Sequence, residues 1–246
     1  MRIENGVEML ELSISVMGKA NVVYPTLIWD EGQAILVDTG YPGQLNQIRK
    51  SVEETGLAFE RLNKVIVTHH DLDHIGSLAD IIRESSGKVE VLSHEKEKPY
   101  IQGEMCPQKL SLLEAKLETL TAETKAIYEG LKAGFEKSKA PVSRTIIDSE
   151  ELPYCGGITV IYTPGHTTGH ISLYHKQSKI LIPGDLLFVE DGLLIAAPKF
   201  TNYDQKTAMK SLEKLTEFDI EKVICYHGGL YGEQVNQRIL ELIQGE

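Results

Sequence analysis

The chain has 246 residues, which suits one large α/β domain or two small ones. Apolar residues make up 41% and charged residues 25%, as in ordinary soluble globular proteins, so extended disorder is not expected. Lys and Arg number 25 against 36 Asp and Glu, and the resulting net charge of −11 repels the phosphates of nucleic acids.

Short strands and helices alternate over the first hundred residues. Apolar alternation and turn residues predict strands over 7–17, 22–29 and 34–37, with a turn at Asp30-Glu31-Gly32. Apolar residues at helical spacing predict helices over 44–55 and 78–85, and short apolar runs predict buried strands over 64–67 and 89–92.

The middle of the chain, about residues 95–145, reads as a helical insert. It is rich in Lys and Glu, and its apolar residues fall at helical spacing over about 110–137. Such an insert can cover a cleft as a lid, form a homodimer contact, or only cover the core. We favour a lid or an entrance element.

The second half returns to strands, predicted over 158–162, 171–174, 179–182 and 222–225, with helices over 207–218 and 234–243. Thr26–Asp38 is similar to Ser172–Asp185, and Lys64–Asp71 to Lys222–Gly229. Similar halves packed face to face would bring their strand ends to one cleft, where α/β proteins usually bind ligands. Chance is the alternative explanation for so short an internal sequence similarity.

The strand over 64–67 is followed by the sequence His-His-Asp-Leu-Asp-His. Alternate residues of an extended loop face the same side, so His69, Asp71 and Asp73 are expected to converge. His74 stands where a helix begins and can turn toward the same cavity. A polar loop that caps a helix is the alternative.

Three other predicted strands are also followed, within a few residues, by a residue of ligand type, namely His166, Asp185 and His227. Glycines beside them permit tight turns and a close approach of the backbone. Imidazole and carboxylate are ligands of zinc, iron and manganese. One histidine at a strand end is usually structural, but four such strand ends predict a metal site.

The remaining histidines receive other roles. His70 faces away from His69 in the loop and is expected to pack or to support a neighbouring ligand. His170 is assigned a supporting or structural role. His94 and His175 are expected at the surface.

These segments resemble the metallo-β-lactamase superfamily, in particular its glyoxalase II and lactonase branches. Residues 68–76 resemble the signature loop His-x-His-x-Asp-His, and residues 163–170 the segment T-P-G-H-T-x-G-H. Asp38-Thr39-Gly40 is similar to the early D-x-G motif, whose Asp supports the metal loop. The resemblance implies one αββα sandwich domain over residues 1–246, a four-layer α/β (α+β) fold with the helical insert inside it.

The resemblance also implies two divalent metal ions. The residues that match the first site are His69, His166 and Asp185. Those that match the second site are Asp73, His74, His227 and the shared Asp185. Asp71 stands where the family has its second histidine; a carboxylate there can still ligate, and it makes the site harder. Zinc is the first candidate, with iron and manganese as alternatives.

The function implied is hydrolysis of an ester-like carbonyl, a thioester or a lactone, by a metal-bridging hydroxide. Asp185 and Asp73 are the candidate catalytic residues. Phe188 replaces the Tyr of typical lactonases, which argues against a typical acyl-homoserine lactonase. Arg238 is the only Lys or Arg after Lys222, so glutathione recognition is not indicated. A single-iron oxygenase of the same fold and a metal-binding protein without turnover are the alternatives.

The cysteines and the lack of a long apolar segment are typical of a cytoplasmic protein, and we expect its substrate to be a small molecule. Three separated cysteines form no Cys-x-x-Cys pair, which implies no disulfide framework and fits a reducing compartment. The first 20 residues carry three glutamates and do not resemble a signal peptide. No window is long and apolar enough to cross a bilayer. We therefore expect neither nucleic acid nor membrane as a partner.

Overall fold

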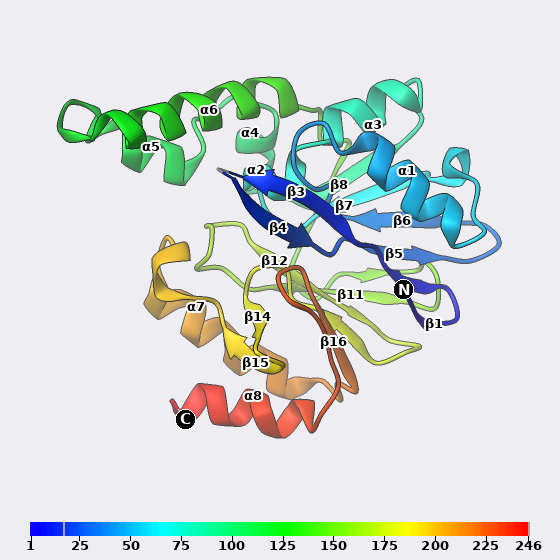
Figure 1. Cartoon of the computed structure of the whole chain (residues 1–246). Helices are drawn as coiled ribbons and strands as arrows, with labels where there is room; N and C mark the ends of the chain where they lie inside the picture. Colours follow the sequence, from blue (N-terminus) through cyan, green and yellow to red (C-terminus); the bar gives the residue numbers. More distant parts are fainter. Residues whose placement is uncertain (17, 246) are drawn as a thin grey trace.

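The computed structural model describes residues 1–16 and 18–245, and within them two β-sheets pack face to face (Figure 1). The first sheet has the order β1-β2-β5-β6-β7-β8-β9. Its strands are β1 (Arg2–Glu4), β2 (Val7–Met9), β5 (Thr26–Trp29), β6 (Ala34–Val37), β7 (Lys64–Val67), β8 (Glu90–His94) and β9 (Arg144–Ile146). The second sheet has the order β10-β11-β12-β13-β16-β17. Its strands are β10 (Glu151–Leu152), β11 (Ile158–Tyr162), β12 (Ile171–His175), β13 (Ile180–Ile182), β16 (Lys222–Cys225) and β17 (Gly229–Tyr231).

Helices cover the outer face of each sheet (Figure 1). Helices α1 (Leu45–Glu54) and α3 (Leu78–Glu84) lie on the first sheet, and α7 (Gln205–Leu212) and α8 (Val235–Gln244) lie on the second. Two hairpins stand beside the sheets, β3 (Leu12–Val16) with β4 (Lys19–Val23) and β14 (Leu187–Glu190) with β15 (Leu193–Ala196). The sequence pattern did not predict the second hairpin. No helix among the described residues has the length and apolar character to cross a membrane.

Successive strand residues enter different cores, as the period of two requires. In β6, Ile35 packs between the sheets and Leu36 packs beneath α1 and α3. In β13, Ile180 packs between the sheets and Leu181 packs beneath α7 and α8. Both faces of both sheets are therefore buried, which confirms the predicted four-layer αββα architecture.

The two halves share one strand arrangement, in agreement with the similarity between their sequences. β5 is antiparallel to β6, which is parallel to β7. β12 is antiparallel to β13, which is parallel to β16. The carboxyl ends of β7, β11, β13 and β16 precede Thr68, Thr163, Pro183 and Tyr226, and so lead into the four polar loops of the predicted site.

The insert connects the parallel neighbours β8 and β9. It contains α4 (Lys98–Ile101), α5 (Gln108–Glu114), the 3-10 turn η2 (Leu117–Thr119) and α6 (Ala122–Ser138). The continuous helix predicted over about 110–137 is wrong, because the Thr121 side chain accepts a hydrogen bond from the Thr124 amide and starts α6 anew. α5 and α6 pack together and project to one side of the sandwich (Figure 1).

Three other predicted elements differ from the structure. The strand expected over 22–29 is divided by Pro25, which has no N–H to donate. The helix expected over 207–218 ends at Leu212 and continues as the 3-10 turn η4 (Glu213–Glu217). The strand expected over 7–17 is divided into β2 and β3, and its last residue, Met17, lies outside the described residues.

The surface positions predicted for His94 and His175 are wrong. His94 is 5% exposed because the Tyr162 ring from the second sheet stacks on it at 4.5 Å. His175 is 3% exposed, since it ends β12 beneath the loop that carries Cys155, and its Nε2 lies 2.5 Å from that residue's carbonyl oxygen. Both rings are covered by segments distant in the sequence.

Candidate metal centre

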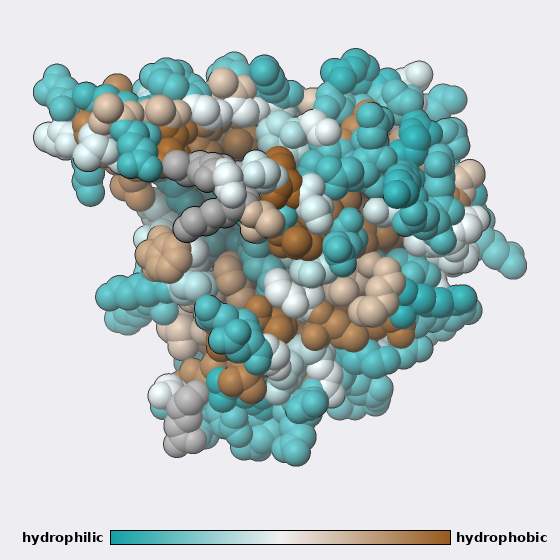
Figure 2. All heavy atoms as spheres, viewed as in Figure 1, coloured by the Kyte–Doolittle hydropathy of each residue, from teal (hydrophilic) through white to brown (hydrophobic). Residues whose placement is uncertain are grey.

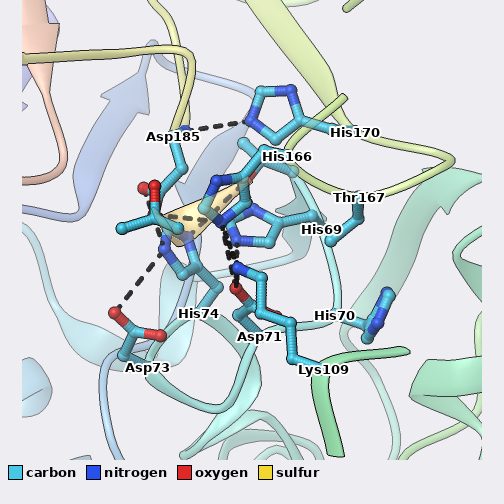
Figure 3. Close-up of polar contacts among 12 residues, drawn as sticks. His69, His70, Asp71, Asp73, His74, Lys109, His166, Thr167, His170 and Asp185 are labelled. Atoms are coloured by element: carbon cyan, nitrogen blue, oxygen red, sulfur yellow. Dashed lines mark hydrogen bonds and ion pairs between the residues drawn. The ribbon is translucent and has the colours of Figure 1, made fainter. Parts of the chain in front are cut away.

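The seven predicted ligand residues come together where the four loops meet. Figure 3 labels six of them, all except His227. They form three overlapping groups, and within each group one donor atom per residue lies within 4.8 Å of the others. The first group is His69, Asp71 and His166, and the second group is Asp73, His74 and His227. The remaining group, His69, His74 and Asp185, links these two. The structure thus brings the predicted residues together, and their roles as ligands remain a prediction.

The first group lies around the Asp71 carboxylate. Asp71 Oδ2 is 3.4 Å from His69 Nε2 and 3.0 Å from His166 Nε2. His166 Nε2 is also 3.4 Å from Asp185 Oδ2. His70 turns away from this group (Figure 3). The expected alternation therefore holds for His69, His70 and Asp71, and Asp71 occupies the place that the family gives to a histidine.

The second group lies around His227. Its Nε2 is 3.3 Å from Asp73 Oδ2 and 3.4 Å from Asp185 Oδ2. Asp185 Oδ1 is 3.2 Å from His74 Nε2, so the Asp185 carboxylate faces donors of both groups, as a shared ligand must. Asp73 and His74 lie in one helical turn, α2 (Leu72–Ile75), rather than in extended chain. Asp73 thus reaches the cluster through this turn rather than through alternation.

Several donor atoms of the cluster fit a bound cation. His69 Nε2, His74 Nε2 and Asp185 Oδ1 are buried and have no hydrogen-bond partner among the described residues. Buried polar atoms nearly always have a partner, so three unpartnered atoms that face one another indicate a site for a bound cation. Imidazole nitrogen and carboxylate oxygen are the donors that divalent transition metals take.

The charges of the cluster also favour a bound cation. Burial alone would lower the pKa of His227, but Asp185 and Asp73 outweigh it and raise that pKa to about 10. Burial would likewise lower the pKa of His74, yet Asp185, Asp38 and Asp73 raise it well above the usual value. Clustered carboxylates thus make the pocket attractive to positive charge.

Asp38 orients the metal loop, in the role that the resemblance implies for it. Its Oδ1 accepts a hydrogen bond from the Thr68 amide at 2.8 Å, and its Oδ2 accepts one from the Thr68 hydroxyl at 2.7 Å. Oδ2 is also 2.9 Å from His74 Nδ1. An imidazole whose Nδ1–H is held by a carboxylate presents Nε2 to the cluster.

His170 supports the loop of Asp185 and does not join the donor groups. Its Nε2 accepts a hydrogen bond from the Asp185 amide at 2.9 Å, and its Nδ1 is 3.0 Å from the Thr163 carbonyl oxygen. Burial lowers the pKa of His170 to about 3, so the ring is neutral, as this pattern requires. Gly184 has φ +56°, and a Cβ there would lie 2.6 Å from His170 Nε2. The turn therefore requires glycine.

Glu97, which the sequence did not single out, joins three loops at the base of the insert. It is fully buried. One oxygen accepts hydrogen bonds from the Thr167 hydroxyl and the Gly169 amide, each at 2.7 Å. The other accepts from the His70 amide at 2.8 Å and contacts His70 Nδ1. His70 therefore supports the site from behind, and Figure 3 shows it beside Thr167.

Lys109 of α5, also not predicted, reaches the first group (Figure 3). Its Nζ contacts Asp71 Oδ2 and lies 2.7 Å from His166 Nε2. Burial alone would raise the pKa of Asp71, but Lys109, His166 and His69 together hold it well below its usual value. The insert thus contacts the site directly. Figure 2 shows the surface hollowed between the insert and the second half. A lysine within a Lys- and Glu-rich segment gives no signal of this role in sequence.

Comparison with known proteins shows the family to which the chain belongs. Residues 18–227 match the family model described as the metallo-beta-lactamase superfamily. The "Probable metallo-hydrolase YflN" of Bacillus subtilis (strain 168) is 27% identical over 229 residues, which cover 85% of this chain and 80% of that protein. The hydroxyacylglutathione hydrolase of Idiomarina loihiensis is 27% identical over 161 residues, 65% of this chain and 44% of that protein. The crystal structure of metallo-beta-lactamase family protein TTHA1429 from Thermus thermophilus superposes with a TM-score of 0.70 at 24% identity, covering 99% of this chain and 80% of that one. Since the family model spans most of the chain, this protein belongs to the metallo-β-lactamase superfamily.

Proposed function

We propose that this protein is a binuclear metal-dependent hydrolase that cleaves an ester-like carbonyl, a thioester or a lactone. The observation that carries the proposal is the position of Asp185, whose two oxygens face donors of both histidine groups. Relatives named metallo-hydrolases support the reaction class. The relative named hydroxyacylglutathione hydrolase supports a thioester, although the match covers less than half of that protein.

The residues divide the work of such a reaction. Divalent ions bound in a cluster of this kind polarise a carbonyl oxygen and lower the pKa of a bound water molecule. The Asp185 carboxylate lies between the two donor groups and would contact the ions of both. Its backbone amide is held by a hydrogen bond to His170. The Asp73 side chain is 19% exposed, so it can also accept a hydrogen bond from the attacking water or the leaving group. No nucleophilic Ser or Cys is required.

The surroundings bear on the substrate. Phe188 lies with its ring 4.6 Å from the ring of His227 and offers an apolar wall where a tyrosine would offer a hydroxyl. The guanidinium of Arg238 donates to the Leu194 carbonyl oxygen and pairs with Glu241. We therefore favour a small substrate that contacts the insert over a typical acyl-homoserine lactone or glutathione substrate. We also propose a cytoplasmic location, because the three cysteines include no Cys-x-x-Cys pair.

Acid release in weak buffer with a pH dye tests the proposal. The zinc-loaded protein is offered thioesters, lactones and β-lactams, each of which yields a carboxylic acid on hydrolysis. We expect release from thioesters or lactones, loss of it with chelator, and loss of it in Asp185→Asn. The matched control is Asp191→Asn, an exposed Asp at φ +51° in the β14–β15 turn, a conformation that Asn accepts.

The outcomes separate the alternatives. Full turnover in Asp185→Asn would refute the mechanism, whatever the substrate. Metal binding with no acid release but with oxygen consumption would indicate a single-iron oxygenase. Metal binding with neither activity would indicate a binding protein.

A further inference from the structure

We propose that the Lys109 ammonium occupies the first donor group in place of a metal ion, so that the protein holds one ion tightly and takes up a second only when this ammonium leaves. The inference rests on the proposed metal-dependent function and concerns how the site is filled.

The ammonium uses the same atoms that a metal ion would use. Lys109 Nζ contacts Asp71 Oδ2 and lies 2.7 Å from His166 Nε2, while Asp71 Oδ2 is 3.4 Å from His69 Nε2. These are donors of one predicted site. Within residues 1–16 and 18–245, the ion pairs of the His74 and His227 rings are all with carboxylates and none is with a lysine, so the second donor group stays open to an ion.

Binding of the ammonium and of an ion at His166 is mutually exclusive. His166 Nδ1 is 3.2 Å from Asn202 Oδ1, and the Asn202 amide nitrogen in turn donates to Gln205 Oε1 at 2.7 Å. His166 therefore donates from Nδ1 and keeps one lone pair on Nε2. That lone pair accepts a hydrogen bond from Lys109 or binds a cation, but it cannot do both.

The charges of the cluster balance with one ion present. Three carboxylates, Asp71, Asp73 and Asp185, belong to the donor groups. One divalent ion and one ammonium carry three positive charges. Asp71 is the carboxylate that replaces the histidine of the family pattern, and it is the one that Lys109 contacts. The extra negative charge and its cation thus occur together.

The ammonium can leave without movement of the insert. The Lys109 side chain is 35% exposed and has a flexible four-carbon stem. The start of α5 is held separately, because the Gln108 amide donates to His70 Nε2 at 3.4 Å and Gln108 Oε1 accepts from the Thr168 amide at 3.0 Å. Uptake of the second ion therefore requires a side-chain rotation only.

Zinc titration of the metal-free protein, followed by calorimetry and by metal analysis after gel filtration, tests this inference. In the wild type we expect one tight zinc ion and a second bound at least about tenfold more weakly, because the second must displace a charge-assisted hydrogen bond. Lys109→Met keeps the length of the side chain and removes the charge. We expect it to tighten the second ion by about tenfold or more and to leave the first unchanged.

The matched control is Lys116→Met, which removes an exposed charge just beyond α5 and should titrate as the wild type does. Circular dichroism checks folding, and Lys109→Gln replaces Lys109→Met if that variant is unfolded. Two ions of equal affinity in the wild type, or a second ion that Lys109→Met fails to tighten, would overturn the inference while chelator-sensitive hydrolysis could stand. A wild type that binds no metal would overturn the proposed function and this inference together.

Discussion

Replacement of Glu97 by Gln should destabilise the fold although the side chain lies outside the donor groups. The two Glu97 oxygens each face two donors, one oxygen the Thr167 hydroxyl and the Gly169 amide, the other the amide and ring of His70. In Glu97→Gln the remaining oxygen can serve His70, and the new amide can donate to the Thr167 hydroxyl. The Gly169 amide is then left buried without an acceptor.

The expected loss of stability follows from this one unsatisfied amide and from the loss of the Glu97 charge. One unsatisfied buried donor costs about 1–3 kcal/mol, and hydrogen bonds to a charged group are worth more than those to a neutral one. We expect the free energy of unfolding of the metal-free protein to fall by about 2–4 kcal/mol in Glu97→Gln. Urea denaturation followed by circular dichroism measures it. Glu95→Gln, an exposed glutamate two residues away, is the matched control and should change stability by less than about 0.5 kcal/mol.

The same contacts predict how this difference depends on pH. Burial would raise the pKa of Glu97, but its interactions with His70 and with the hydroxyl of Thr167 hold that pKa below its usual value of 4.5. A carboxyl group with a lowered folded pKa contributes stability that is full above the unfolded pKa and is lost as the pH falls through the folded one. The difference between wild type and Glu97→Gln should therefore be constant from neutral pH down to about pH 5 and shrink below it. The reasoning is refuted if the two glutamate variants unfold alike at pH 7.

Three further predictions follow from single contacts. Asp38→Asn disturbs the carboxylate that holds the His74 ring and should weaken zinc binding by about 10–100-fold in competition with a chromogenic chelator; unchanged affinity would mean that the ring is oriented without it. Gly184→Ala places a Cβ at φ +56° and 2.6 Å from His170 Nε2, and should cost about 1–3 kcal/mol in urea unfolding, so a wild-type midpoint would contradict the strain. Burial lowers the pKa of His175 below 6.5 despite its hydrogen bond to the Cys155 carbonyl oxygen, so the stability it contributes is lost as the pH falls from 6.5 through the lower folded value. The stability advantage of wild type over His175→Gln should then narrow between pH 7 and pH 5; a constant gap would show that the ring does not titrate on unfolding.

The predicted donor residues could be found because their signals are local. Each lies in the loop or turn that follows an apolar strand, and alternation in the loop separates Asp71 from His70. The supporting contacts could not be found in this way, because they join distant positions: Glu97 is 27 residues from His70, and Lys109 is 57 from His166. Charged residues in a polar segment normally lie in solvent, so nothing local distinguishes these two.

Burial of polar residues was misjudged for a related reason. His94 and His175 stand at strand ends, where exposure is decided by what lies above them rather than by the strand itself. The Tyr162 ring that covers His94 comes from the other sheet, and the Cys155 loop that covers His175 lies 20 residues away in the sequence. The break in the insert was missed because apolar spacing continues across Thr121, whose capping side chain competes locally with helix continuation.

The division of the donors between the halves has a consequence for unfolding. The first half supplies His69, Asp71, Asp73 and His74, and the second supplies His166, Asp185 and His227. An ion held by both halves acts as a cross-link between the two sheets, since it binds the assembled chain and not the separated sheets. Free ion at about a hundred times its dissociation constant would add about 2.7 kcal/mol to the free energy of unfolding. The inter-sheet core would then come apart together with the ion, and the melting temperature would report metal occupancy.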